Sequence, residues 1–228
     1  MVVINPEIEN TLELENIEWK PLLTAHKNRS SDIYVDSSHK YLKKTKRRKG
    51  HKRDYEFYNL AFWKKILDLY NSETGSDIHT PAPYIAEGRD LIMQYLTGIE
   101  MDRLLSPGSL AKENVNEIME KIGQLFKIKE NEELLHKDLD LRHILINGGL
   151  YVIDLENAQY GNGQVKIENK ELVRKVKELY KGSIDSAIEK GYESIPKISV
   201  IDEALSSIES VFGGRSKFYL TGRYRKKA

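Results

Sequence analysis

The chain has 228 residues, of which 39% are hydrophobic and 31% charged, and its formal net charge is +1. This length predicts one domain or two small lobes, enough to bury a core without disulfides or metal staples. The absence of cysteine excludes a disulfide framework, a cysteine-ligated zinc site, an iron–sulfur cluster and a thiol nucleophile. There is neither a signal-peptide pattern nor an apolar run of the ~18 residues that a membrane span needs. We therefore expect a soluble, cytoplasmic protein.

The small net charge hides an uneven distribution. A first basic segment, residues 40–53, holds 9 Lys and Arg residues and no acid, and a second basic segment, residues 215–228, holds 6 and no acid. The rest of the chain is acidic. Such patches indicate either solvated surface or attraction to phosphate on a nucleotide, a nucleic acid or an anionic membrane.

In chain order the first third is rich in strands and the remainder in helices. Residues 32–36 and 40–43 form a predicted hairpin around a serine turn, an amphipathic helix follows, and a second strand pair comes after a proline-rich segment. The predicted helices are 54–70, 110–133, 172–192 and 200–212. The composition changes near Thr97, so we expect an α+β protein with a β-rich N-lobe (1–96) and a short, mostly helical C-lobe (97–228).

The most informative segment runs from 134 to 161. Two apolar stretches flank Asn147-Gly148-Gly149, which is a strong hairpin signal. Asp138 and His143 precede the first strand, and Asp154 ends the second. Because a hairpin brings its open ends together, we expect these three side chains to lie close to one another.

This set of residues suits phosphoryl transfer. One carboxylate of such a set is able to accept the proton of an attacking hydroxyl. A second carboxylate, with a neighbouring polar ligand, is able to hold Mg²⁺ on nucleotide phosphates. Each residue taken alone is more often structural than catalytic, so the prediction depends on their combination.

The two halves of this segment resemble a known family. Residues 136–146 read HKDLDLRHILI and residues 151–159 read YVIDLENAQ. They are similar to the forms HRDLYxCHFLL and YVIDLHRAQ of the lipopolysaccharide kinases of the Kdo/heptose kinase type, which have the two-lobed protein-kinase-like fold. That family carries histidine where most kinase-like enzymes have asparagine, as His143 does here. The resemblance covers only about 28 residues and implies an ATP- and Mg²⁺-dependent kinase. It implies that Asp138 is the base or orienting group for the acceptor hydroxyl and that Asp154 and His143 hold Mg²⁺.

A kinase of this kind also needs a strand lysine for the phosphates and a helix glutamate that pairs with the lysine. We expect Lys43 in the first role, because Leu42 beside it would point into the core, with Lys44 as the second choice. Glu56, one turn into the next helix, is expected to be the glutamate.

The resemblance also implies a hinge that binds adenine through backbone groups of Gln94 and Leu96, with Met93 at the gatekeeper-like position. One expected part is absent, because residues 26–38 contain no glycine and so no glycine-rich phosphate loop.

Three hypotheses remain open at this stage. The first is a kinase acting on a lipopolysaccharide core sugar or a related glycolipid, with the basic patches in peripheral contact with the inner face of a membrane. The second is the small kinase/ATPase of the tRNA threonylcarbamoyladenosine-modifying complex, which ends in a comparable basic tail but has asparagine in place of His143. The third is a pseudokinase that only binds a partner. DNA is not expected as a partner of any of them.

Overall fold

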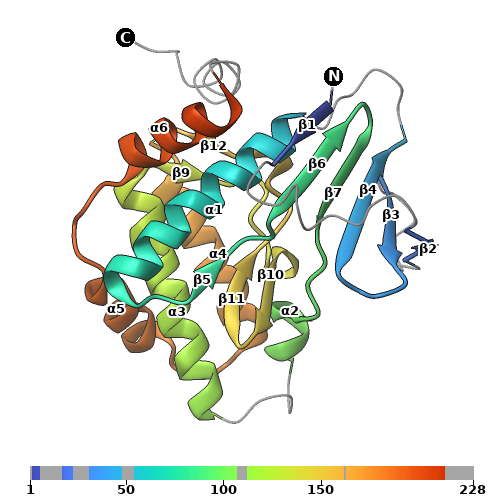
Figure 1. The fold of residues 1–228 in the computed structure, drawn as a ribbon. Coiled ribbons are helices and arrows are strands. Elements are labelled where there is room, and N and C mark those ends of the chain that lie inside the picture. Colours follow the sequence, from blue (N-terminus) through green and yellow to red (C-terminus); the bar gives the residue numbers. More distant parts are fainter. Residues whose placement is uncertain are drawn as a thin grey trace.

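The computed structural model describes residues 2–5, 17–22, 31–47, 54–106, 112–161 and 163–213. Part of the first basic segment (48–53) and all of the second therefore lie outside the described residues. Within the described ranges, no helix is long and apolar enough to cross a membrane. The expected two-lobed α+β architecture is confirmed, with a sheet-rich part on one side and a helical part on the other (Figure 1).

The larger sheet has six strands in the order β1-β6-β7-β4-β3-β2, and all its neighbouring strands are antiparallel. Its strands are β1 (Val2–Ile4), β2 (Trp19–Pro21), β3 (Ser31–Asp36), β4 (Tyr41–Lys46), β6 (Pro83–Glu87) and β7 (Asp90–Gln94). Both predicted strand pairs are present. The β3–β4 turn is held by Asp36, whose carboxylate accepts hydrogen bonds from the backbone N–H groups of Ser38, Lys40 and Tyr41.

Helix α1 (Asp54–Thr74) links this sheet to the helical part and confirms the predicted helix, which runs four residues further than expected. It packs against α6 (Ile201–Phe212), β6 and β5 (Ile78–His79) (Figure 1). Residues 56–63 of the helix are all buried, and Ile66, Leu67 and Tyr70 continue the buried face at helical spacing. Three polar residues of the helix are also buried, Asp54, Glu56 and Asn59, and the last two serve the site described below.

The second part is built around a four-stranded sheet in the order β5-β11-β10-β8. The predicted hairpin at residues 144–153 is confirmed as β10 (Ile144–Asn147) and β11 (Gly149–Val152), and Gly148 turns between them with φ of +71°. The other elements are β8 (Ile99–Glu100), α2 (Met101–Leu104), α3 (Lys112–Asn131), β9 (Leu134–Leu135), β12 (Gln159–Tyr160), α4 (Val165–Leu179) and α5 (Asp185–Ser194).

The prediction of one helix over 172–192 is wrong. Two helices occupy this region, α4 and α5, because the backbone turns to an extended conformation at Tyr180 and Gly182 follows. A Cβ at position 182 would lie 2.5 Å from the ring of Tyr180, so a larger residue there would have to displace that ring.

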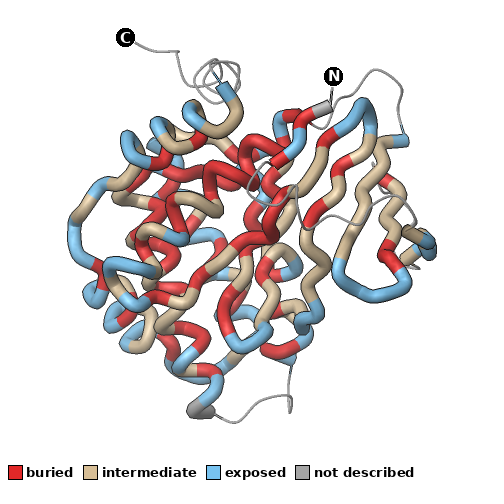
Figure 2. Tube along the Cα trace, in the orientation of Figure 1, coloured by how far each residue is buried: buried red, intermediate tan, exposed pale blue. Residues whose placement is uncertain are grey.

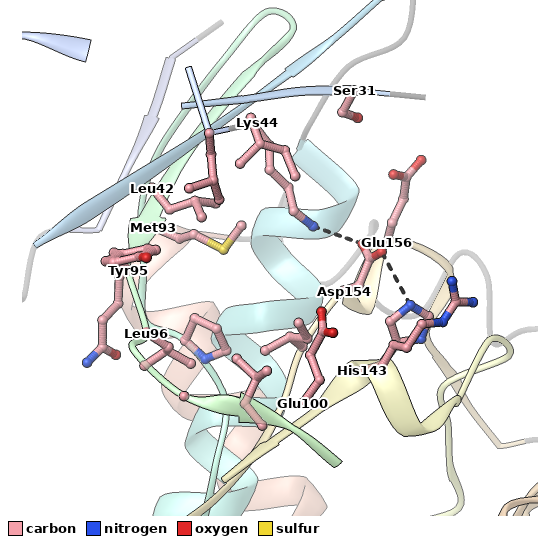
Figure 3. A pocket seen from close by; sticks show the side chains of 18 of the residues that line it. Ser31, Leu42, Lys44, Met93, Tyr95, Leu96, Glu100, His143, Asp154 and Glu156 are labelled. Carbon is pink, nitrogen blue, oxygen red and sulfur yellow. Dashed lines mark hydrogen bonds and ion pairs between the residues drawn. The ribbon is translucent and has the colours of Figure 1, made fainter. Parts of the chain in front are cut away.

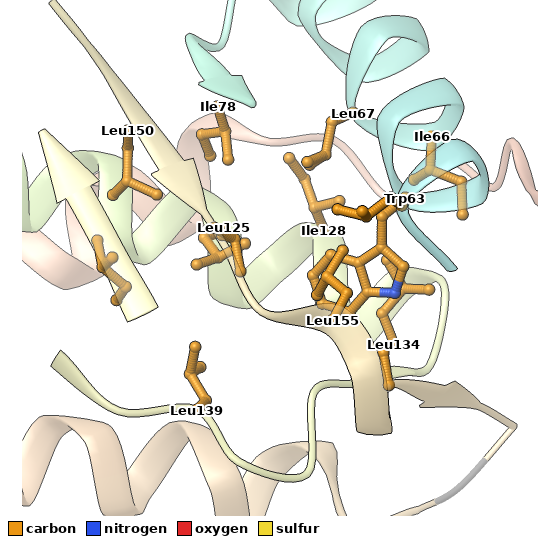
Figure 4. Packing of buried hydrophobic residues seen from close by; sticks show 14 of the residues in the cluster. Trp63, Ile66, Leu67, Ile78, Leu125, Ile128, Leu134, Leu139, Leu150 and Leu155 are labelled. Carbon is orange, nitrogen blue, oxygen red and sulfur yellow. The ribbon is translucent and has the colours of Figure 1, made fainter. Parts of the chain in front are cut away.

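One buried cluster joins the two parts (Figure 2). Trp63, Ile66 and Leu67 of α1 meet Leu125 and Ile128 of α3, and apolar residues of the hairpin and of the loops around it complete the cluster (Figure 4). The loops on either side of the β10–β11 hairpin are thus seated on a packed core.

Candidate active site

Strand β4 supplies a lysine to the cleft between the two parts, and this lysine is Lys44. Leu42 and Lys44 line the cleft, whereas Lys43 lies on the opposite face of the sheet. There its Nζ lies 4.7 Å from the ring centroid of Trp19 and 5.0 Å from that of Tyr34. The expectation for Lys43 is wrong, because strand side chains alternate and position 43 must face away from Leu42.

Lys44 makes two ion pairs that connect three elements. Its Nζ lies 2.6 Å from Oε1 of Glu56 on α1. It also lies 2.8 Å from Oδ1 of Asp154 after β11, as Figure 3 shows. Glu56 is therefore the partner of the cleft lysine, as expected. Burial by itself would lower the pKa of Lys44, but Asp154 and Glu56 outweigh it and raise the pKa above its usual range. The Lys44 charge in turn holds the pKa of Asp154 far below that of an ordinary aspartate.

The loop before β10 places His143 against the backbone of Asp138 and near Asp154, so the expected proximity is confirmed for His143 and Asp154. Nδ1 of His143 lies 2.5 Å from the backbone oxygen of Asp138, and its Nε2 lies 3.9 Å from Oδ2 of Asp154. The ring of His143 stacks on that of His136, at 5.5 Å between centroids and 11° between planes. The side chain of Asp138 is exposed, so it is accessible to an incoming substrate.

His136 is fully buried and fixes this loop to the hairpin. Its Nε2 lies 2.8 Å from the backbone oxygen of Ile153, the residue before Asp154. Among the described residues its Nδ1 has no hydrogen-bond partner. Burial lowers the pKa of His136, which favours the neutral ring.

A second anchor of the same loop comes from helix α4. The Glu168 carboxylate accepts hydrogen bonds from the backbone N–H groups of His136 (3.1 Å) and Lys137 (2.6 Å). It also pairs at 2.7 Å with Lys129 of α3, whose side chain is completely buried. Lys137 has a φ of +71°, so the loop needs such an anchor to hold a residue in the left-handed region.

The backbone after Asp154 is held by Asn59 of α1. Its Nδ2 donates to the backbone oxygens of Leu155 (2.9 Å) and Ala158 (3.3 Å). Asp154 itself is left-handed, with φ of +63°. Asn59 and Glu168 are positioning residues that the sequence interpretation missed. Their partners are backbone groups many residues away, so no local pattern marks them.

The side-chain donors around Asp154 meet only part of the coordination that Mg²⁺ requires. Mg²⁺ binds proteins through one or two side chains and completes its shell with water and substrate phosphates. Two adjacent donors of one octahedral ion at about 2.1 Å lie about 3 Å apart. Nε2 of His143 and Oδ2 of Asp154 are 3.9 Å apart, so the two side chains would have to approach by about 1 Å to share one ion. The described residues contain no cluster of three or more His, Asp or Glu side chains suited to a metal. The site therefore fits Mg²⁺ only as a metal brought with a phosphate ligand.

A cavity of about 760 Å³ lies between the two parts (Figure 3). This volume is within the range of small-molecule sites. Met93, Gln94 and Leu96, predicted as hinge residues, all line it, as do His143 and Asp154. The N–H of Gln94 donates to the backbone oxygen of Ala82 at 2.8 Å, so that donor is already used within the sheet.

Charged residues that the sequence interpretation did not single out also line this cavity. They are Glu100 and Arg103 near α2, Arg142 beside His143, and Glu156 beyond Asp154. Arg103 pairs with Glu100 at 3.1 Å, and Arg142 lies 3.7 Å from Asp140. The cavity thus has a lysine at its inner end and two arginines along its walls.

Comparison with known proteins adds a fold to this geometry. No family model and no curated protein matches the sequence. Two solved structures of the Rio2 kinase from Chaetomium thermophilum are similar. Its ADP/Mg²⁺-phosphoaspartate complex has a TM-score of 0.51 at 14% identity, covering 96% of this chain and 73% of that one. A second Rio2 kinase structure has a TM-score of 0.52 at 15% identity, covering 97% and 76%. The chain has a protein-kinase-like fold.

A third match is the streptomycin–ATP–APH(2")-IIa ternary complex, with a TM-score of 0.43 at 16% identity, covering 96% of this chain and 100% of that one. In the kinase-like frame the six-stranded sheet and α1 form the N-lobe, and α2 to α6 surround the C-lobe. Lys44 is then the N-lobe lysine, and Asp138, His143 and Asp154 lie on C-lobe loops.

Proposed function

We propose that this protein is an ATP-dependent phosphotransferase that transfers the γ-phosphoryl group to a hydroxyl. The observation that carries the proposal is the contact of Lys44 with both Glu56 and Asp154. It joins a strand, a helix and a loop from both lobes at the end of a cavity large enough for a nucleotide. A lysine held between two carboxylates stays charged and in place, as binding of phosphates requires.

Each residue of the site has a role in this proposal. The hinge from Met93 to Leu96 accommodates adenine through backbone groups, and Lys44 contacts the phosphates. Asp154 and His143 hold Mg²⁺, which when bound neutralises phosphate charge. Asp138 accepts the proton of the acceptor hydroxyl or orients it.

For the acceptor we propose a sugar of the lipopolysaccharide core or a related glycolipid. The similarity of residues 136–146 and 151–159 to the lipopolysaccharide kinases supports this choice. The two arginines that line the cavity, Arg103 and Arg142, are suited to an anionic sugar. Peripheral contact with an anionic membrane through the basic segments is part of the same proposal.

The test is calorimetric titration with Mg-ATP of the wild type, of Asp154→Ala and of Asp68→Ala, a control at an exposed aspartate of α1. We expect Asp154→Ala alone to lose Mg-dependent binding, and we expect the wild type to transfer the γ-phosphoryl group of ATP to a lipopolysaccharide core sugar. Unchanged binding in Asp154→Ala would refute the site.

Two further outcomes decide between the other hypotheses. ATP hydrolysis without sugar transfer, combined with tRNA binding that is lost when residues 215–228 are removed, would favour the tRNA-modification kinase/ATPase. No nucleotide binding by the wild type would indicate a pseudokinase.

A further inference from the structure

A second lysine of β4 faces the same side of the strand as Lys44. Lys46 lies two positions further along, and its Nζ forms an ion pair with Oε1 of Glu156, a residue that lines the cavity. Glu156 is likewise two positions beyond Asp154. The N-lobe strand is thus joined to the loop after β11 by two parallel ion pairs, Lys44–Asp154 and Lys46–Glu156.

The main chain of Lys46 is fixed, and its side chain reaches Glu156 at the edge of the cavity. Its N–H donates to the backbone oxygen of Arg89, and its own oxygen accepts from Nη1 of Arg89 at 3.3 Å. Across the sheet Lys46 pairs with Ser31, which lines the cavity. The Lys46 side chain is 12% exposed and that of Glu156 is 27% exposed.

The absence of glycine from residues 26–38 makes this second cation significant. Glycine permits the closest approach of backbone amides to phosphates, so in its absence side chains have to meet more of the phosphate charge. Two lysines two residues apart on a strand are separated by about 7 Å, so a ligand with more than one phosphate is able to contact both.

We propose that Lys46 is a second phosphate-binding lysine and that Glu156 is the counterion it leaves when a nucleotide binds. This inference rests on the proposed nucleotide site and extends it. The exchange is feasible because both side chains of the pair keep some contact with solvent, which screens the attraction between their charges. A phosphate offers more negative charge than a carboxylate and strong acceptor oxygens, and Glu156 is exposed enough to regain water.

The experiment is calorimetric titration of the full chain with ATP, ADP and adenosine at fixed Mg²⁺ and low ionic strength. The variants are Lys46→Ala, Glu156→Gln and the control Lys43→Ala, which removes a lysine from the opposite face of the same strand. Thermal unfolding of each variant verifies that it is folded before titration.

We expect Lys46→Ala to weaken ATP binding about tenfold, equivalent to about 1.4 kcal/mol, and to leave adenosine binding unchanged. Glu156→Gln should strengthen ATP binding by a few-fold, because it releases Lys46 from a competing charge. Lys43→Ala should behave as the wild type.

The inference is overturned if Lys46→Ala binds ATP as tightly as Lys43→Ala does, if it weakens adenosine as much as ATP, or if Glu156→Gln weakens ATP binding. In these cases nucleotide binding by the wild type that is lost in Asp154→Ala would leave the proposed function standing. A wild type that binds no nucleotide would refute both the proposed function and this inference.

Discussion

The buried ion pair between Glu168 and Lys129 gives the sharpest test of how the Asp138 loop is held. In Glu168→Gln the shape is kept, but the carboxylate that neutralises Lys129 is lost, while the Lys129 side chain stays fully buried. Removing one partner of a buried pair costs about 3–5 kcal/mol, because the other charge remains without compensation. The variant also weakens the acceptor for the N–H groups of His136 and Lys137.

This loss is large compared with the stability of a typical domain, about 5–15 kcal/mol. At about 2–4 °C per kcal/mol for a chain of this size, the unfolding midpoint should fall by about 6–20 °C. Urea unfolding of the wild type and the variant, followed by circular dichroism, measures the change in free energy of unfolding directly. Transfer activity should fall as well, because Lys137 loses the contact that holds its left-handed backbone.

A double-mutant cycle separates the pair from the rest of the core. In Lys129→Met/Glu168→Gln the buried charge is gone, so we expect this double variant to be more stable than Glu168→Gln. The coupling free energy between the two positions should be at least ~1 kcal/mol. A loss below ~1 kcal/mol in Glu168→Gln, or strictly additive single changes, would refute the argument that the carboxylate compensates a buried charge.

Three further predictions follow from other contacts of the core. Asn59→Ala should lower the free energy of unfolding in urea by about 1–3 kcal/mol, because two buried carbonyls lose their donor. It should also raise the Mg-ATP dissociation constant, and an unaffected dissociation constant would contradict the positioning role of Asn59. Gly191→Ala should lower the free energy of unfolding by at least about 1–3 kcal/mol, since its Cβ would lie 1.9 Å from the backbone oxygen of Glu120. The control Gly163→Ala, whose Cβ would meet nothing within 4 Å, should be near neutral. Equal melting temperatures of the two variants would refute this. Because burial lowers the pKa of His136 below its unfolded value, the unfolded state binds the proton first and stability falls as the pH drops below about 6.5. His136→Gln should flatten this dependence between about pH 7 and 5.5, and an unchanged slope in urea titrations would contradict it.

The part of the site that the sequence predicted is local in the chain. The β10–β11 hairpin has a strong turn signal, and residues at its open ends must approach each other, so the proximity of His143 and Asp154 followed from the pattern alone. Glu56 was predicted from its place one turn into a helix, and it does contact the cleft lysine.

The choice between Lys43 and Lys44 failed for a physical reason. Strand β4 has no alternation of apolar and polar residues, and all six of its positions are partly buried. Without contrast between the two faces, the sequence does not fix which lysine points into the cleft. The aromatic rings of Trp19 and Tyr34 favour the observed orientation, because they offer the outward-facing Lys43 a cation–π contact. Trp19 belongs to a strand more than twenty residues away, so no local pattern shows this contact.

The alternation of side-chain direction along β4 also changes the interpretation of the first basic segment. Its composition suggests a uniform cationic surface, yet Lys44 and Lys46 point inward and pair with acids of the C-lobe. Arg47 is also engaged, at 2.8 Å from a carboxylate of the neighbouring strand. Much of the charge in the described part of the segment therefore acts within the protein. The proposed attraction to an anionic membrane would then depend mainly on residues 48–53 and on the second basic segment. Removing Lys44 or Lys46 would accordingly impair phosphate binding in the cleft much more than any long-range electrostatic attraction of the protein.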